Sequence, residues 1–276
     1  MPELPEVEVI LNQLRSHILE STIKEFHVQR SDIIRIGLSS RQWYLGTQIT
    51  DLIRKGKSLI FTCRKNQLTR YMLAELGMTG LFLFQSASTG YDKHIHLTFT
   101  LEQSNEATLH YWNPRRFGRV YLLDAEQLAH FTQRRFGIDP LSLTQEKFHE
   151  LIHNSRGRMK AFLLNQHKLA GIGNIYANEI LYDARIHPYA QGYRLSRAAI
   201  ARLYGSTQNI LQQAIISGGS SIRDFRAPDG SRGHFQQQHV IYQKAGHPCP
   251  RGCSKIIKRL TSERSSFYCP SCQKRT

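Results

Sequence analysis

The chain has 276 residues, which is enough for two domains or for one domain with a small additional module. Its 37 Lys and Arg residues outnumber its 21 Asp and Glu residues, which gives a formal net charge of +16 at pH 7. This excess indicates a polyanionic partner, most often nucleic acid; a merely soluble basic protein is the alternative. No apolar run approaches the ~18–20 residues of a membrane span, so we expect no membrane partner.

The first predicted element is a helix over residues 5–20. Its apolar residues recur on one face, which we expect to be buried: Val7, Ile10, Leu11, Leu14 and Ile18. Pro5 suits the first turn of a helix, and Glu6 and Glu8 suit its positive end. The same segment lacks the basic start of a signal peptide, so we expect the protein to stay in the cytoplasm.

Short β-like runs follow from about residue 22 to residue 125. They read TIKEFHV, SLIFTC, GLFLF, HIHLTFTL and ATLHYW. We therefore predict a β-rich domain, a sandwich or a barrel, with the first helix packed against it. Cys63 lies alone in one of these runs, where we expect it to be a small buried hydrophobe.

From about residue 130 the pattern becomes helical. The segments MKAFLLNQ, NEILYDARI and SRAAIARLYGSTQNILQQAI are separated by the turn-like LAGIGN and HPYAQGY. A glycine-rich and basic stretch follows, SGGSSIRDFRAPDGSRGHF, which we expect to be a loop. These changes of pattern predict an α+β protein with domains at residues 1–130, 131–238 and 239–276.

Four cysteines near the end of the chain have the spacing Cys249-x3-Cys253-x15-Cys269-x2-Cys272. Two close pairs separated in this way are typical of a zinc ribbon, in which four thiolates surround one tetrahedral ion. Two disulfides or unrelated thiols are the alternatives, and an intracellular setting and the spacing disfavour them. Because protein ligands fill all four positions, the single Zn2+ is expected to be structural.

The segment between the two cysteine pairs is basic, and we expect it to form a hairpin that carries Lys255, Lys258, Arg259 and Arg264. A basic hairpin beside a zinc ion can bind a phosphate backbone or enter a groove of nucleic acid. A solvated charged face is the alternative for each of these residues.

Three further motifs are weak when each is taken singly. GIGN, at residues 171–174, is expected to join two helices, with Asn174 capping the second, whose N-terminus suits phosphate. NPRRFG, at residues 113–118, combines arginine with an aromatic residue that can fill a gap between stacked bases, although Phe117 can equally be core. Lys57 in RKGKSL precedes a strand, where a lysine usually protects a sheet edge.

Taken in chain order, the motifs resemble those of one family. MPELPEVE, the lysine of RKGKSL, LGMTG, NPRRFG, GIGNIYANE, the GGSSIRDF segment and the cysteine ribbon follow one another as in bacterial formamidopyrimidine-DNA glycosylases of the Fpg/Nei family. The resemblance extends over essentially the whole chain. Leu4 distinguishes the chain from the related endonuclease VIII branch, which typically begins PEGPE.

The resemblance implies a fold and an activity. The fold is an N-terminal helix on a β-sandwich, a helix–two-turn–helix domain and a C-terminal zinc-finger hairpin, with damaged double-stranded DNA in the cleft between domains. The activity is that of a monomeric base-excision-repair glycosylase and AP lyase, cytoplasmic and associated with the nucleoid, which removes oxidised purines and cuts the strand by β,δ-elimination. An endonuclease VIII-like enzyme for oxidised pyrimidines and a non-catalytic damage-binding protein remain as alternatives.

The resemblance also implies roles for residues of this chain. After removal of Met1, the secondary amine of Pro2 would attack the damaged nucleotide at C1′, with Glu3 as its acid–base partner and Lys57 as a proton donor. Arg264 would contact phosphate and assist the later elimination. The other expected DNA contacts are Met78, Arg115 and Phe117, which would fill the space of the flipped nucleotide, and His94 and Asn174, which would contact phosphates.

Residues 217–235 match the loop that closes over the oxidised purine in that family. Four positions depart from the family pattern: Ser58 stands where Tyr is usual, Glu75 where His is frequent, Asn113 where Asp is usual, and Ser155 where Lys is frequent. A Glu75 carboxylate that faced DNA would repel phosphate, so we expect it to be turned away or paired.

Overall fold

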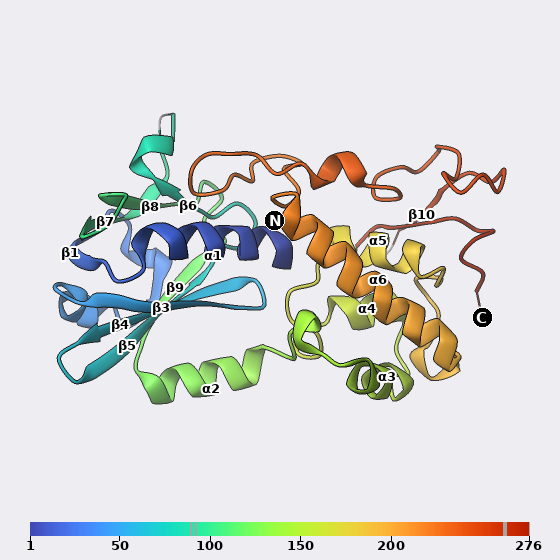
Figure 1. The fold of residues 1–276 in the computed structure, drawn as a ribbon, viewed down its shortest axis with the longest axis horizontal. Helices are drawn as coiled ribbons and strands as arrows, with labels where there is room; N and C mark the ends of the chain where they lie inside the picture. Colours follow the sequence, from blue (N-terminus) through green and yellow to red (C-terminus); the bar gives the residue numbers. More distant parts are fainter. Residues whose placement is uncertain (89, 92, 262–263, 276) are drawn as a thin grey trace. The chain divides into compact units, whose positions relative to one another are not determined.

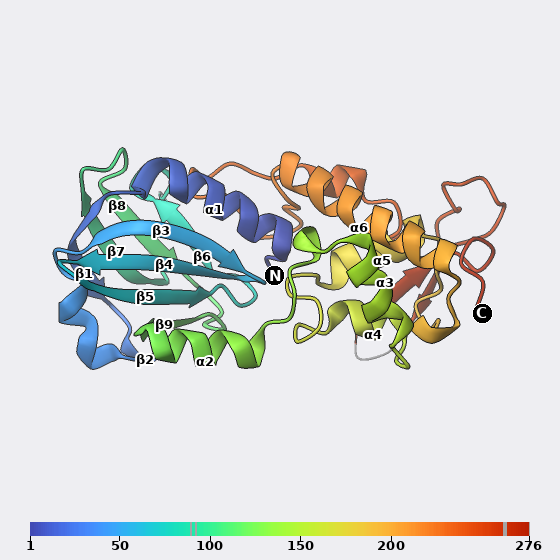
Figure 2. The same ribbon diagram turned by 60° about the horizontal axis from the view of Figure 1, so that its bottom comes forward.

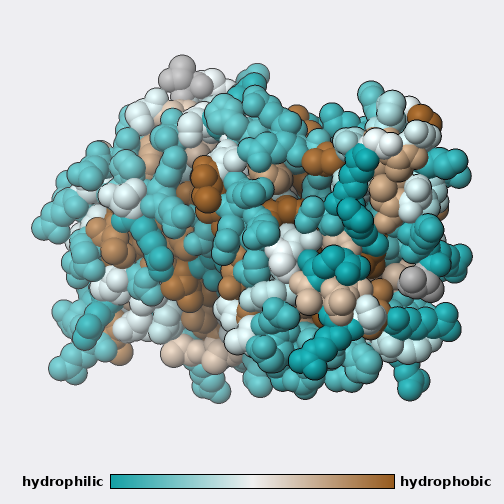
Figure 3. Space-filling view, turned by 45° about the vertical axis from the view of Figure 1, so that its right-hand side comes forward, coloured by the Kyte–Doolittle hydropathy of each residue, from teal (hydrophilic) through white to brown (hydrophobic). Residues whose placement is uncertain are grey.

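The computed structural model of the protein describes residues 1–88, 90–91, 93–261 and 264–275. The chain forms two compact units, Met1–Arg135 with Ile215–Gln236 and Phe136–Ala214 with Gln237–Thr276. Within the described ranges no helix combines the length and the apolarity that crossing a membrane requires. On the face drawn in Figure 3, hydrophilic side chains predominate and hydrophobic side chains occupy separate areas.

The first unit contains a helix, the strands of a large sheet and a second helix (Figure 1). In chain order its elements are α1 (Leu4–Ile18), β1 (Thr22–Val28), η1 (Ser31–Ile33), β2 (Ile34–Ile36), η2 (Leu38–Tyr44), β3 (Gln48–Lys55), β4 (Ser58–Lys65), β5 (Leu68–Glu75), β6 (Leu81–Phe84), η3 (Gln85–Ala87), β7 (Ile95–Glu102), β8 (Thr108–Trp112), β9 (Arg119–Leu123) and α2 (Ala125–Arg135). The elements labelled η are 3-10 helices.

The sheet has the strand order β2-β9-β5-β4-β3-β1-β7-β8-β6. Its neighbouring strands are antiparallel except β2 and β9, which are parallel. Strand β1 pairs with β7 along its length and with β3 only at Thr22, so the ladder passes at β1 from one layer to the other. Figure 2 shows β3, β4 and β5 in one layer and β6, β7 and β8 in the other, which is the predicted sandwich.

Helix α1 packs against this sandwich with the face that the sequence predicts. Its buried residues Val7, Ile10, Leu11, Leu14 and Ile18 join the same core as residues of both layers, such as Phe61 and Phe99. The helix ends at Ile18, earlier than predicted, because Glu20 has a φ of 66° and cannot continue a right-handed helix. Cys63 is fully buried in β4, as predicted.

The second unit is helical and ends in a small hairpin. Its elements are η4 (Pro140–Ser142), α3 (Gln145–His153), α4 (Met159–Leu164), α5 (Asn174–Asp183), η5 (Gly192–Arg194), α6 (Arg197–Ile216), β10 (Lys258–Leu260) and β11 (Ser266–Tyr268), with η6 (Phe235–Gln238) and the end of α6 at the boundaries with the first unit. The hairpin pairs Lys258 with Tyr268 and Leu260 with Ser266. Its apolar side packs on α5 through Tyr182, Ile257 and Phe267.

Candidate DNA-binding and catalytic site

Pro2 and Glu3 lie at the start of α1, and both are buried. Glu3 is the N-cap residue and forms a capping box with Glu6, whose carboxylate accepts a hydrogen bond of 2.7 Å from the Glu3 backbone N–H. The same Glu6 carboxylate accepts a second hydrogen bond of 2.8 Å from the backbone N–H of Ser220. Glu6 therefore joins the start of α1 to the glycine-rich loop, a role that its sequence position alone does not reveal.

The charged groups near the start of α1 act on the terminal amine. Burial lowers the pKa of the Met1 amine below its ordinary value of about 8.0, and the charge of Lys57 lowers it further. The carboxylates of Glu3, Glu6 and Asp224 oppose this shift. Lys57 and Asp224, from distant parts of the sequence, thus act on the amine together with the neighbouring Glu3 and Glu6.

Lys57 is held in place by the tight turn between β3 and β4. Gly56 has a φ of 59°, which suits glycine in a two-residue hairpin turn. The Arg54 guanidinium, almost fully buried, forms an ion pair with Glu8 of α1 and also donates a 3.3 Å hydrogen bond to the carbonyl of Gly56. This pair ties the turn that carries Lys57 to α1.

Met78, Arg115 and Phe117 lie together on two touching loops of the first unit. A Cβ on Gly77, whose φ is 62°, would lie 2.5 Å from the backbone carbonyl carbon of Phe117, so only glycine permits this approach. The Arg115 guanidinium lies over the Phe117 ring at 5.3 Å from its centroid. Met78 is 40% exposed and Phe117 is 53% exposed, so the alternative that Phe117 belongs to the core is wrong.

Asn113, one of the departures from the family pattern, is fully buried beneath these loops. Its side chain accepts from Thr79 Oγ1 at 3.4 Å and donates to Tyr111 Oη at 3.1 Å. Its backbone N–H donates to the carbonyl of His94 at 3.0 Å, and its own carbonyl accepts from the Arg116 N–H at 3.1 Å. Asn113 therefore connects the segment of Met78, the exposed His94 and the Arg115–Phe117 loop.

Glu75 is paired, as expected. Its carboxylate oxygens lie 2.8 Å from Arg135 Nη1 and 2.9 Å from Tyr121 Oη, which donates to it. Arg135 also stacks over the ring of Phe131, 4.5 Å from its centroid. The negative charge of Glu75 is thus compensated inside the first unit.

Residues 217–235 form a loop that is hydrogen-bonded at several points to other segments of the first unit. Gln13 of α1 donates to the Asp229 carboxylate at 2.9 Å, and the Phe84 N–H donates to the carbonyl of Pro228 at 2.9 Å. Gly219 has a φ of 78°, and a Cβ there would lie 3.0 Å from the side chain of Glu6. The loop therefore needs glycine where it passes the start of α1.

In the second unit, Asn174 is the first residue of α5 and not its cap. The N-cap position is Gly173, so the prediction that Asn174 caps this helix is wrong by one residue. The physical reason is that the extended backbone of Gly173, with φ of −124°, already delivers the chain into the first turn. Asn174 stays at the positive end of α5, where backbone N–H groups favour an anion.

Arg264 is exposed and lies two residues before the start of β11 of the hairpin. Lys258 and Arg259, on β10, are exposed as well, and Arg259 Nε donates to Ser265 Oγ at 3.0 Å. The predicted basic hairpin is therefore present in the structure.

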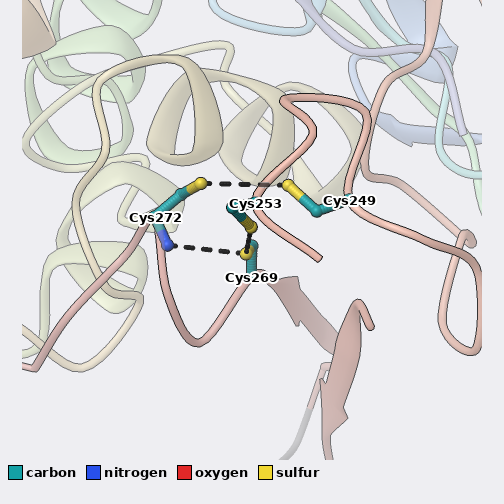
Figure 4. Close-up of side chains that lie close together, drawn as sticks. All are labelled: Cys249, Cys253, Cys269 and Cys272. Carbon is teal, nitrogen blue, oxygen red and sulfur yellow. Dashed lines mark hydrogen bonds between the residues drawn. The ribbon is translucent and has the colours of Figure 1, made fainter. Parts of the chain in front are cut away.

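The four C-terminal cysteines converge at the base of this hairpin, with sulfurs within 4.8 Å of one another (Figure 4). The Sγ atoms of Cys249 and Cys272 are 3.8 Å apart, and those of Cys253 and Cys269 are 3.4 Å apart. Ligands at about 2.3 Å from a tetrahedral Zn2+ lie about 3.8 Å from one another, so these residues fit a metal ion. All four are free thiols, so the disulfide alternative is wrong.

Comparisons with known proteins agree with this geometry. Residues 1–120 match the family model of the formamidopyrimidine-DNA glycosylase N-terminal domain, and residues 136–226 match that of the formamidopyrimidine-DNA glycosylase H2TH domain. The chain is 38% identical to a formamidopyrimidine-DNA glycosylase of Streptococcus thermophilus, with 100% of both chains covered. It is 36% identical to one of Nitrosococcus oceani, with 99% of this chain and 100% of the relative covered.

Two solved structures show the same architecture. MutM (Fpg) from Thermus thermophilus superposes with a TM-score of 0.85 at 32% identity, covering 100% of both chains. A mutant of Lactococcus lactis Fpg, solved in complex with a Fapy-dG containing DNA, superposes with a TM-score of 0.88 at 32% identity, covering 99% of this chain and 100% of that chain. By its sequence and its fold, this chain belongs to the formamidopyrimidine-DNA glycosylase family.

Proposed function

We propose that the protein is a DNA glycosylase with AP lyase activity that removes oxidised purines, such as 8-oxoguanine and formamidopyrimidines, from double-stranded DNA. The observation that carries this proposal is the cluster at the start of α1. Pro2 and Glu3 are buried there beside Glu6, and the charges of Glu3, Glu6 and Lys57 act on the terminal amine. The names of the relatives support it, and so does the Lactococcus lactis structure with a Fapy-dG containing DNA.

In the proposed reaction, removal of Met1 leaves the secondary amine of Pro2 at the terminus. Its lone pair forms a bond to C1′ and the glycosidic bond breaks. The damaged base leaves with the electron pair of the glycosidic bond and takes up the proton that the amine loses. Glu3 gives a proton to the ring oxygen as the sugar opens, which leaves an iminium cation between Pro2 and C1′. This step needs the neutral amine. Pro2 is buried, and burial disfavours a charged amine, as it does for the Met1 amine, whose pKa is lowered.

The strand is cut in the following steps. The iminium cation acidifies the C2′ proton, whose removal expels the phosphate on the 3′ side, and a second elimination expels the phosphate on the 5′ side. Water then hydrolyses the bond to Pro2 and restores the amine. In this scheme Lys57 donates a proton near the lesion, and Arg264 binds a phosphate that leaves.

The DNA is held by residues of both units in this proposal. Met78, Arg115 and Phe117 fill the space that the flipped nucleotide vacates, and His94 and Asn174 contact phosphates. One Zn2+ bound by Cys249, Cys253, Cys269 and Cys272 stabilises the hairpin that carries Arg264 and takes no part in the chemistry. Action on DNA also places the protein in the cytoplasm, at the nucleoid.

Trapping with borohydride tests the proposal directly. Duplexes that contain 8-oxoguanine, a formamidopyrimidine or thymine glycol are incubated with the protein, and the iminium is reduced to a stable adduct. We expect adduct and strand cleavage with the two purine lesions, with peptide mapping that places the adduct on Pro2. Pro2→Gly is expected to weaken trapping severely, while Lys147→Met, in an exposed ion pair on α3, leaves it unchanged.

Each other outcome has a distinct meaning. An adduct on an internal lysine in protein that retains Met1 would overturn the assignment of Pro2. Preferential cleavage at thymine glycol would assign the protein to oxidised pyrimidines, and damage-specific binding without any adduct would make it a non-catalytic reader of damage.

A further inference from the structure

Arg264 projects from a hairpin loop, yet the residues that directly follow it are held firmly by two helices. Ser265, Ser266 and Phe267 each receive a hydrogen bond from, or give one to, a buried side chain of α4 or α5. An exposed arginine on a mobile loop would lose much conformational entropy when it binds a phosphate. The anchoring of the next three residues reduces that loss before DNA arrives.

The first anchor is Lys160, the second residue of α4. Its side chain is almost fully buried, with a relative exposure of 4% for the residue. Its ammonium donates to the carbonyl of Ser265 at 2.6 Å and to Ser266 Oγ at 2.9 Å. A buried ammonium is costly unless it is well hydrogen-bonded, so these two contacts are strongly specified.

The second anchor is Asn178 of α5, which is 1% exposed. Its Oδ1 accepts a 2.8 Å hydrogen bond from the Phe267 N–H, and its Nδ2 donates to the carbonyl of Asn174 at 2.6 Å. One side chain thus connects β11 of the hairpin with the first residue of α5. One end, Asn174, is proposed to contact a DNA phosphate. The other end, Phe267, lies three residues after Arg264, which is proposed to bind a phosphate.

A cavity of about 480 Å³ lies beside the first anchor. It is lined by Lys160, Arg264 and Ser266, and also by Arg158, whose guanidinium stacks on the ring of Tyr189 at 4.2 Å. Arg264 thus shares the lining of this cavity with two other basic residues of the second unit, Arg158 and Lys160. Arg264 therefore sits between an anchored strand and a space that suits a phosphate group.

We propose that Lys160 and Asn178 form a clamp that positions Arg264 for phosphate binding and strand elimination. They are positioning residues: neither touches the substrate, and both act through the backbone of residues 265–267. The inference rests on the proposed function for the elimination step, but the clamp also predicts DNA affinity, which can be measured without any turnover.

A double-mutant cycle tests the clamp. The variants are Lys160→Met, Asn178→Ala, Arg264→Gln and each clamp variant combined with Arg264→Gln, with Lys147→Met as the control for loss of one positive charge. The affinity of each variant is measured for a duplex with a tetrahydrofuran abasic analogue. The single-turnover rate of elimination and the yield of adduct on Pro2 are measured separately, on the lesion duplexes of the trapping experiment. Zinc content and thermal unfolding are recorded for each variant.

We expect Lys160→Met to slow elimination by about 10- to 100-fold, the range that a displaced catalytic group produces. The yield of adduct on Pro2 should change much less. In the Arg264→Gln background the same substitution should have almost no further effect on affinity or elimination, because its target is already absent. Asn178→Ala should act in the same direction, and Lys147→Met should match the parent.

Three results would overturn the clamp. The first is that the effects of Lys160→Met and Arg264→Gln on affinity and elimination rate multiply in the double variant. The second is that the adduct yield falls as much as the elimination rate. The third is that both clamp variants lose zinc, which would show a purely structural role. If Lys160→Met fails to fold, the Asn178→Ala cycle decides the question alone. Failure of the proposed function appears in the parent protein as absence of adduct, and the affinity cycle then still decides for or against the clamp.

Discussion

At the scale of single residues, buried polar side chains hold together the segments of the candidate site. Glu3, Glu6 and Asn113 are almost inaccessible to solvent, and burial of such groups is unfavourable unless each finds hydrogen-bond partners. Glu6 finds them in the N–H groups of Glu3 and Ser220, and Asn113 finds them in the loops around Met78 and Phe117. Ser220 and Thr79 come from distant parts of the sequence, so their hydrogen bonds to Glu6 and Asn113 fix loops in place.

The pH dependence of adduct formation follows from the charges around the amine. Only the neutral amine attacks, so the rate rises with pH through the pKa of the amine. Burial lowers the pKa of the Met1 amine, and we expect the buried Pro2 amine to titrate likewise below the ordinary range of about 7.7–8.0. Lys57→Met removes a cation that lowers the pKa, so the midpoint should rise. Asp224→Asn removes an anion that raises it, so the midpoint should fall.

Single-turnover adduct formation, quenched at intervals between pH 5 and pH 9, measures these midpoints independently of the maximal rate. Shifts in the same direction for both variants would contradict the electrostatic origin of the effect.

At the scale of elements, the sequence predicts those whose pattern is local. The run TIKEFHV coincides with β1, and the apolar face of α1 is the one predicted from its spacing. The sequence does not predict the parallel pairing of β2 with β9 or the passage of the sheet from one layer to the other at β1. Hydrophobic alternation indicates a strand but does not indicate which strand it pairs with. Helix α5 is buried on nearly every side, so it carries little amphipathic signal.

We expect the hairpin of β10 and β11 to depend on a bound metal ion, because its strands have only three residues each and its core is small. Structural zinc supplies folding free energy in such small modules. Removal of Zn2+ by a chelator should therefore open the hairpin and abolish DNA binding, while the sandwich stays folded. The measurement is thiol reactivity together with released zinc.

The fifth cysteine gives that experiment an internal control. Burial raises the pKa of the Cys63 thiol to about 12, so it should stay unreactive until the protein is denatured. We expect one Zn2+ released and four thiols exposed by chelation, with a fifth in denaturant. Five reactive thiols before any chelator is added would contradict a metal-bound ribbon.

The whole molecule carries a formal charge of +16, which suits a partner dense in phosphate. Each cation that neutralises a phosphate contributes about 0.9 to the slope of the logarithm of affinity against the logarithm of salt concentration. With Arg264 and further cations at phosphates, we expect a slope of at least about 3 in magnitude. Arg264→Gln should lower the slope by about 0.9, and Lys147→Gln should leave it unchanged.

Fluorescence anisotropy with a lesion duplex at several salt concentrations measures this slope. A flat dependence would mean that the positive charge of the molecule is not directed at DNA.

The sequence by itself determined the partner class, the cluster of four cysteines, the apolar face of α1 and the family. Charge balance, cysteine spacing and helical periodicity are properties of short stretches or of composition. Only the tertiary structure decided which residues serve the site together. It placed Glu6 against Ser220, Asn113 beneath the loops of Met78 and Phe117, and Lys160 behind Arg264. A hydrogen bond between residues far apart in the chain leaves no pattern in a single sequence, because it depends on packing that only the complete fold provides.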